Sequence, residues 1–311
     1  MAPVMDMKKR WRTPFCLVLC CGALWFLADA AHCRAAVEEA LSLCARSVIP
    51  SLFPFLVISS LLLAMGFGDL TASVLSGLME PLFRIGGPGS AALVLGLLGG
   101  YPIGAKTAGE LYQSHALSRQ EAERLLTFCN NCSPVFLISV LGSGIFGSVR
   151  AGVWLLLIHV GSALLVGLLF RGTSSACSQD MSRSCTFQAI SPVQAFVSAV
   201  DGALRSVLSV CAFVTFFYVL SRPLSSLGSP AGALLVGMTE LFSLTPLLTP
   251  DRFGFILAAG AAGWGGLSVL CQTAAALEGS GLRLRYYLAG KALQGLFSAL
   301  LAAALSGYVL G

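Results

Sequence analysis

The stretch LLGGYPIGAKTAG, from Leu97 to Gly109, is unusual inside an apolar chain. It holds four glycines, a proline and a lysine within thirteen residues, and it follows the apolar run AALVLG. Glycine admits backbone conformations that a helix does not hold, and Pro102 removes a hydrogen-bond donor and frees a carbonyl. The stretch therefore predicts a helix break or hairpin tip between Leu98 and Lys106.

The composition around this break is that of a membrane protein. The 311 residues are 56% hydrophobic and 11% charged, whereas soluble domains carry roughly 25% charged residues. Several apolar stretches approach or exceed the roughly 20 residues that cross a bilayer. Unpaired backbone at membrane depth is tolerated only where protein buries it or where it lines a wet cavity. The break therefore predicts such a setting, and the alternative is an interfacial loop from which Lys106 snorkels.

Positive charge is concentrated near the start of the chain. Lys8, Lys9, Arg10 and Arg12 precede the first apolar run, at residues 13–30, and such a cluster is normally held in the cytoplasm. We therefore expect a cell-membrane protein with a cytoplasmic N-terminus. The first segment is either a signal-anchor helix or a cleaved signal peptide. A nucleic-acid partner is not expected, because no basic soluble domain is visible.

About eight hydrophobic segments predict an all-α polytopic fold, built from two related halves with broken or re-entrant helices. The expected divisions are a basic segment with the first membrane helix (1–35), a first membrane half (36–170), a polar linker rich in Ser and Cys (171–191) and a second half (192–311).

The two halves share short sequence matches. ARSVI at 45–49 recurs as LRSVL at 204–208. A glycine followed three residues later by a glutamate also recurs. The pair is Gly77 and Glu80 in the first half, and Gly237 and Glu240 in the second. Weak internal symmetry with interrupted segments at corresponding positions indicates a transporter-type site.

A second break is predicted from Asn130 to Pro134. Two adjacent amides in an apolar segment cost free energy unless they are hydrogen-bonded, and Asn130 and Asn131 carry both donors and acceptors. These groups suit the binding of a polar solute or an ion, and the alternative is that they join helices. Between the two breaks, Ser118 and Glu121 have the spacing of a capping box, which predicts a water-facing helix at 118–126.

Two further candidates lie in the second half. Glu240 is a carboxylate inside the apolar run ALLVGMTELFSLTPLL, so it is a candidate site residue. Its expected partner is Lys106, Arg205 or a bound cation, and a structural salt bridge is the alternative. GWGGLSVLCQT, at 263–273, repeats the glycine break and adds polar groups such as Ser268.

Catalytic signatures are weak. Cys129 and Cys132 form a lone C-x-x-C without a second pair or nearby histidines, which disfavours zinc, and the eleven cysteines show no disulfide framework. His159 lies in a spanning segment and is expected to be a packed histidine. The chain has no H-E-x-x-H and no P-loop. We therefore expect no enzyme activity, no metal and no cofactor.

The order of features from Gly99 to Pro134 resembles a known family. A G-Y-P-x-G-A-K break, an acidic and basic helix and an Asn-rich break ending in Ser-Pro are similar to the sporulation integral membrane proteins of the YlbJ type, which carry the nucleoside-recognition or Gate domain. The resemblance runs from about Ala40 to Lys291. It implies a multi-pass inner-membrane protein of endospore-forming bacteria that is needed for spore formation. The domain is related to folds of concentrative nucleoside transporters, which use inverted repeats and broken helices.

By matching positions, the resemblance implies a set of residues that line a central substrate-binding site. They are Gly100, Tyr101, Pro102, Gly104, Lys106, Asn130, Asn131, Ser133, Pro134, Glu240, Gly265, Gly266 and Ser268. Two places depart from the family pattern. Cys132 stands where a small residue such as Ser or Ala is expected, and LFSLTP after Glu240 replaces a small, polar, glycine-bearing run.

Two function classes follow. The first is a transporter or channel-like protein that binds a small polar, nucleoside-like solute through Asn130, Asn131 and Lys106. The second is a non-transporting membrane scaffold for assembly of the spore cortex or coat. The expected partners are the lipid bilayer, a small polar solute with a coupling cation, and sporulation membrane proteins or a second copy of the chain.

Overall fold

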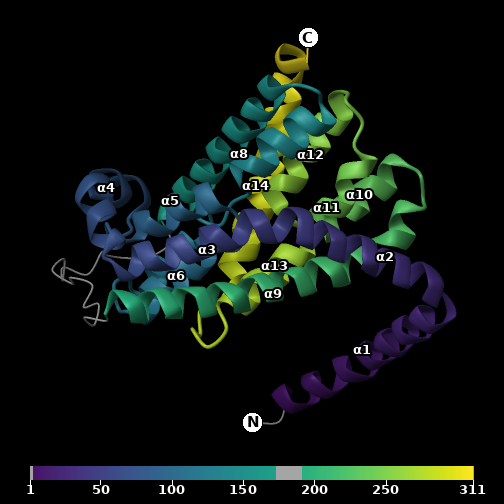
Figure 1. Ribbon diagram of the computed structural model, residues 1–311, viewed down its shortest axis with the longest axis horizontal. Coiled ribbons are helices and arrows are strands. Elements are labelled where there is room, and N and C mark those ends of the chain that lie inside the picture. The colour runs from purple at the N-terminus through teal and green to yellow at the C-terminus, as the bar shows by residue number, and fades with distance from the viewer. Residues whose placement is uncertain (1–2, 173–190, 311) are drawn as a thin grey trace.

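The computed structural model describes residues 3–172 and 191–310, and this part of the chain is α-helical without a strand. Figure 1 shows long helices running in two directions and joined by shorter ones. Most of the predicted linker at 171–191 lies outside the described residues, as do residues 1–2 and 311. The predicted all-α polytopic class is confirmed.

The elements in the first half are α1 (Pro3–Ala28), α2 (Ala30–Leu43), η1 (Cys44–Val48), α3 (Ile49–Ala64), α4 (Phe67–Phe83), α5 (Gly89–Gly99), α6 (Ile103–Gln113), α7 (Arg119–Leu125), η2 (Phe136–Ile145), α8 (Val149–Leu169) and η3 (Phe170–Gly172). Those in the second half are α9 (Pro192–Ser225), α10 (Pro230–Thr239), α11 (Leu241–Leu244), η4 (Thr245–Leu247), α12 (Arg252–Trp264), α13 (Gly266–Ala276) and α14 (Leu284–Leu310).

Within the described residues, five helical segments are long and apolar enough to cross a membrane. They are Ala30–Ala64, Val149–Gly172, Pro192–Ser225, Arg252–Ala276 and Leu284–Leu310. Shorter apolar helices accompany them at Cys16–Ala28, Gly89–Gly99, Phe136–Ile145 and Pro230–Thr239. Helices of 10–17 residues are too short to span a bilayer unaided, since about 20 residues are needed. They therefore match the prediction of broken or re-entrant segments.

The long helices form two packed groups. The rod made by α2, η1 and α3 packs against α9, whereas α8 and α12 pack against α14. Figure 1 shows α3 and α9 crossing the view, while α8, α12 and α14 rise towards the C-terminus. The matching stretches ARSVI and LRSVL lie on the neighbouring rod and α9. The other match has two different local structures, because Gly77 and Glu80 lie inside α4 whereas Glu240 ends α10.

The three predicted interruptions are present, and within the described residues Glu240 adds a fourth break that the sequence did not predict. Break 1 separates α5 from α6 at residues 100–102, and break 2 runs from Asn130 to Ser133 as irregular chain outside any helix. Break 3 is Glu240, whose backbone is extended, and break 4 is Gly265, whose φ of 86° lies in the left-handed region that favours glycine. The predicted capping box is also confirmed, because Ser118 and Glu121 bond to each other's backbone N–H.

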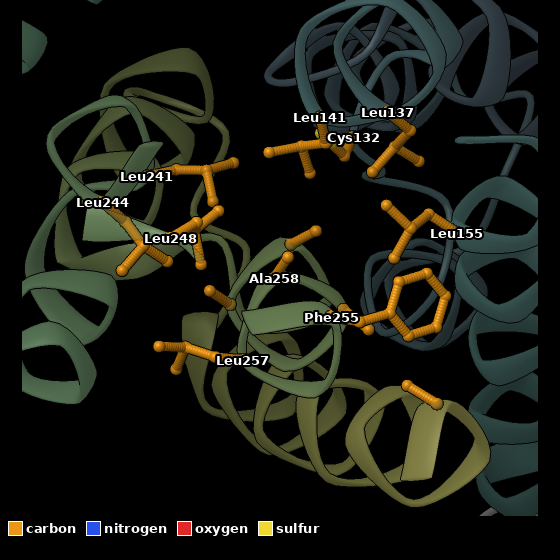
Figure 2. Close-up of a cluster of buried hydrophobic side chains, with 14 of the residues drawn as sticks. Cys132, Leu137, Leu141, Leu155, Leu241, Leu244, Leu248, Phe255, Leu257 and Ala258 are labelled. Carbon is orange, nitrogen blue, oxygen red and sulfur yellow. The ribbon is translucent and has the colours of Figure 1, made fainter. Parts of the chain in front are cut away.

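A buried apolar cluster joins the first half to the second. Figure 2 shows Leu155 beside Phe255, with Leu137 next to Leu155. Leu241 and Leu244 lie on the opposite side of Ala258. These side chains come from η2, α8, α11 and α12. Helices in lipid associate largely through such van der Waals packing. The cluster therefore fixes how breaks 2 and 3 lie relative to each other.

Candidate functional site

Two glycines hold break 2 against the helices around break 1. A Cβ atom on Gly96 would lie 2.0 Å from the carbonyl oxygen of Cys129, and one on Gly104 would lie 2.1 Å from the same atom. Only glycine permits so close a backbone approach. Gly104 therefore has a positional role in the candidate site, since it brings the backbone of break 2 against α6.

The Asn130 side chain ties three elements together. Its Oδ1 accepts a hydrogen bond from the backbone N–H of Ala105, 3.3 Å away. Its Nδ2 donates to Thr273 Oγ1 at 3.0 Å and to Tyr287 OH at 3.3 Å. The amide is fully buried, and both of its donors and one acceptor site are used. This geometry matches the alternative, in which such amides join helices.

Asn131 points into a neighbouring polar cluster. Its Nδ2 donates to the carbonyl oxygen of Phe128 at 2.8 Å, and its Oδ1 accepts from Gln294 Nε2 at 3.0 Å. The same Nε2 is 3.3 Å from the carbonyl oxygen of His159. His159 Nε2 accepts from the backbone N–H of Cys132 at 3.0 Å. His159 is packed, as expected, and it provides a hydrogen-bond acceptor for a buried backbone N–H of break 2, that of Cys132.

A buried lysine completes the network. Lys291 on α14 is 2% exposed, and its Nζ donates to Tyr101 OH at 2.6 Å. It also donates to Gln294 Oε1 at 2.7 Å and to the backbone carbonyl oxygen of Asn130 at 3.2 Å. Tyr101 OH donates in turn to the carbonyl oxygen of Ala262 at 3.0 Å. Lys291 therefore links breaks 1 and 2 to α14.

A cavity of about 90 Å³ lies where three of the breaks meet. Break 1 contributes Gly100 and Tyr101, break 2 contributes Ser133, and break 3 contributes Glu240. Gln272 of α13 adds an amide to the wall. The rest of the wall is mostly apolar, and its side on the rod and α9 is formed by Val48, Leu52, Val210 and Val214, with Ser51 as a polar member. Four predicted site residues therefore share one cavity, although they are far apart in the sequence.

Glu240 has a different partner from those expected. Its Oε2 accepts from the backbone N–H of Ser243 at 2.5 Å, which caps α11. Lys106 lies 3.9 Å from Glu110, and Arg205 lies 2.9 Å from Asp201. Within the described residues neither cation forms an ion pair with Glu240, so the expected salt bridge is corrected to a helix cap. The carboxylate is 2% exposed and borders the cavity.

Lys106 lies outside the cavity wall. Its Nζ is 3.3 Å from Ser60 Oγ on α3 and 3.9 Å from Glu110 Oε1 on the next turn of α6. Burial raises the pKa of the Glu110 carboxyl, and the nearby Lys106 ammonium opposes that rise. The hydrogen bond from Lys106 to Ser60 therefore joins α6 to α3, beside the cavity rather than in it.

The other predicted residues shape the breaks. Pro102 precedes α6 and Pro134 directly follows break 2. A Cβ on Gly265 would lie 3.4 Å from the Tyr101 ring, and one on Gly266 would lie 2.9 Å from the carbonyl oxygen of Thr239. Ser268 is fully buried and accepts from Gln272 Nε2 at 3.1 Å. These residues position the wall that Tyr101 and Gln272 form.

The sequence interpretation missed the α14 side of the site. Lys291 and Gln294 were passed over because the last span reads as an ordinary apolar helix. Tyr287, which bonds Asn130, also carries no local signal, whereas Thr273, its second partner, lies in the predicted glycine break at 263–273. One signal was available, since an ionisable residue inside an apolar span indicates a functional site by default.

The comparisons with known proteins agree with this geometry. Residues 45–151 match the model of the Gate family, described as nucleoside recognition, and this range contains breaks 1 and 2. The chain is 28% identical over 306 residues to the sporulation integral membrane protein YlbJ of Bacillus subtilis (strain 168), covering 85% of this chain and 75% of the relative. No solved structure matches the chain. The resemblance is therefore confirmed: residues 45–151 of this multi-pass membrane protein match the Gate family model, and the chain is similar to a sporulation integral membrane protein over most of its length.

Proposed function

We propose that the chain is a transporter or channel-like protein of the spore-forming cell's membrane and that it binds a small polar solute in the cavity between the breaks. One observation carries this proposal: Tyr101, Ser133 and Glu240, from three separate breaks, line one cavity. Irregular backbone at membrane depth is tolerated where it lines a cavity. Binding sites of many transporters lie between such discontinuous helices.

The wall chemistry favours a solute that donates hydrogen bonds or carries positive charge. Glu240 supplies a carboxylate, and Ser133 and Gln272 supply a hydroxyl and an amide. Carboxylates accept hydrogen bonds when ionised. A neutral polar solute or an organic cation therefore fits this wall better than an anion does.

The cavity volume sets the size of solute that fits without movement. About 90 Å³ accommodates several water molecules or a small polar group, whereas drug-sized ligands occupy pockets of roughly 300–1,000 Å³. A nucleoside therefore requires a wider cavity. The wall from the rod and α9 is the part that would have to move, because breaks 1 and 2 are held by the hydrogen-bonded network.

Ligand-dependent thermal stability tests this function. We would screen the purified full chain against nucleosides, bases, organic cations and organic anions. A ligand at about 100 times its dissociation constant adds roughly 2.7 kcal/mol of stability. We expect a shift in wild type that is lost in Glu240→Gln and kept in Glu110→Gln, the matched control outside the cavity wall. A chain that no member of the panel stabilises contradicts the proposal and favours the scaffold function.

We also propose an orientation in the membrane from the charges at the two ends of α14. Near its start, Arg119 bonds the carbonyl oxygen of Gly281 and the backbone N–H of Arg283 bonds Glu123. Near its other end, Arg150 and Arg252 bond the carbonyl oxygens of Tyr308 and Ala303.

The end near the start of α14 carries the greater positive charge. Its arginines are Arg84, Arg119, Arg124, Arg283 and Arg285. Cytoplasmic loops carry an excess of Lys and Arg, so this end faces the cytoplasm and the C-terminus faces the outside. C-terminal fusions test the orientation: an alkaline phosphatase fusion should be active and a green fluorescent protein fusion dark, and the reverse result contradicts it.

A further inference from the structure

Lys291 is a buried cation without a carboxylate partner. Its Nζ donates hydrogen bonds to three oxygens, those of the Tyr101 hydroxyl, the Gln294 amide and the Asn130 backbone carbonyl. These bonds use all three N–H groups of the ammonium. No ion pair to Lys291 is present among residues 3–172 and 191–310. The titratable side chains that act on it are Tyr101, Cys129, Cys132 and His159. None of them is an aspartate or a glutamate.

The three oxygens resemble the ligands of a hard metal cation. Such ions take oxygen ligands that include backbone carbonyls and Asn or Gln side chains. In transporters with discontinuous helices, the carbonyls of unwound backbone hold the coupling ion. The Asn130 carbonyl belongs to break 2, so the Lys291 ammonium occupies the kind of place where such an ion would sit.

This ammonium is also connected to the cavity wall. Tyr101 OH accepts from Lys291 Nζ at 2.6 Å and donates to Ala262 at 3.0 Å, while the same tyrosine lines the cavity. The Nζ atom lies 4.7 Å from the centre of the Tyr101 ring. A positive charge placed here holds Tyr101 and break 2 in fixed positions beside the solute.

We propose that the Lys291 ammonium is the built-in cation of this site and takes the place of a coupling metal ion, an inference that rests on the proposed solute-binding function. Solute binding then needs no Na⁺, Li⁺ or K⁺. The coupling cation expected from the sequence is supplied by the protein itself. Removing the lysine side chain leaves an oxygen-lined space that an alkali cation can fill.

Thermal unfolding in different salts tests this without any solute. Wild type, Lys291→Ala, Lys291→Met and the control Lys106→Ala are compared in NaCl, LiCl, KCl and choline chloride at equal ionic strength. We expect the Tm of wild type and of Lys106→Ala to be the same in all four salts. Lys291→Ala should have a lower Tm than wild type in choline chloride. In one of the alkali salts its Tm should rise by about 5 °C, and the rise should saturate as the salt concentration increases. Lys291→Met fills the space and should not respond.

Two results overturn the inference. One is a Tm of wild type that rises selectively with one alkali cation, because a metal ion would then bind beside the lysine. The other is a Lys291→Ala protein that no alkali salt restores, including one that fails to fold in all four salts. The salt experiment tests the cation assignment independently of the proposed solute binding, because none of these samples contains solute. A failed ligand screen with the expected salt response would refute the solute and leave the cation assignment standing.

Discussion

The two sides of the candidate site differ in how fully their polar groups are paired. On the network side, Asn130, Gln294 and Lys291 bond to other protein groups in a buried cluster. On the cavity side, Glu240 and Ser133 border open space and are held mainly by their own local helix turns. This difference separates residues that position the breaks from residues that are free to meet a solute. The predictions below test that separation.

The largest effect is expected at the closest backbone contact. Gly104→Ala places a methyl group 2.1 Å from the Cys129 carbonyl oxygen, so break 2 would have to move away. Overpacking of this kind costs about 1–3 kcal/mol and occasionally more. We expect little folded protein in detergent by size-exclusion chromatography. Gly161→Ala is the control, since nothing lies within 4 Å of its added Cβ, and normal folding of both variants would contradict the structure.

The next effect is expected on the network side. Asn130→Ala leaves the backbone N–H of Ala105 and the hydroxyls of Thr273 and Tyr287 without their amide partner. A buried group left unsatisfied costs about 1–3 kcal/mol. We expect a lower unfolding temperature and, in a cycle with Thr273→Val, a coupling of roughly 0.5–3 kcal/mol. A stable variant that has lost only solute binding would instead place Asn130 among the solute ligands.

A smaller effect on stability is expected on the cavity side. Glu240→Gln keeps an oxygen that can accept from the backbone N–H of Ser243, so the cap of α11 is retained. We expect the free energy of unfolding to change by no more than about 1 kcal/mol, because the hydrogen bond is kept or only weakened and its whole net contribution is of that size. Chemical or thermal unfolding beside Asn130→Ala gives the comparison. A loss as large as that of Asn130→Ala would show that Glu240 also belongs to the structural network.

The smallest effect on solute binding is expected outside both sides, at the cap of α7. Ser118→Ala removes the side chain that accepts from the backbone N–H of Glu121. Loss of an N-cap costs roughly 0.5–2 kcal/mol. Solute binding should be unchanged, because α7 contributes no residue to the cavity wall. Altered binding would mean that the loop end of the molecule controls the cavity.

The sequence was enough to predict breaks 1, 2 and 4, but neither break 3 nor the side chains that face the cavity. Glycine and proline have local conformational consequences, so Gly100, Pro102 and Gly265 marked the interruptions without knowledge of the fold. The direction in which the Lys106 side chain points depends on how α6 is rotated about its axis against α3, and no local pattern specifies that rotation. Lys291 was missed because its three partners come from positions 101, 130 and 294. Those contacts exist only after the helices pack.

The most direct test of the central claim is solute uptake into proteoliposomes that contain the full chain. The solute that stabilises the purified protein would be supplied outside the vesicles, in choline buffer without alkali cations. The account predicts uptake by wild type and by Glu110→Gln, with at least a tenfold loss in Glu240→Gln, since a charged-group hydrogen bond is worth about 1.5–3 kcal/mol. Equal uptake by wild type and Glu240→Gln, or none above empty vesicles, would contradict the claim that the cavity between the breaks is a transport site.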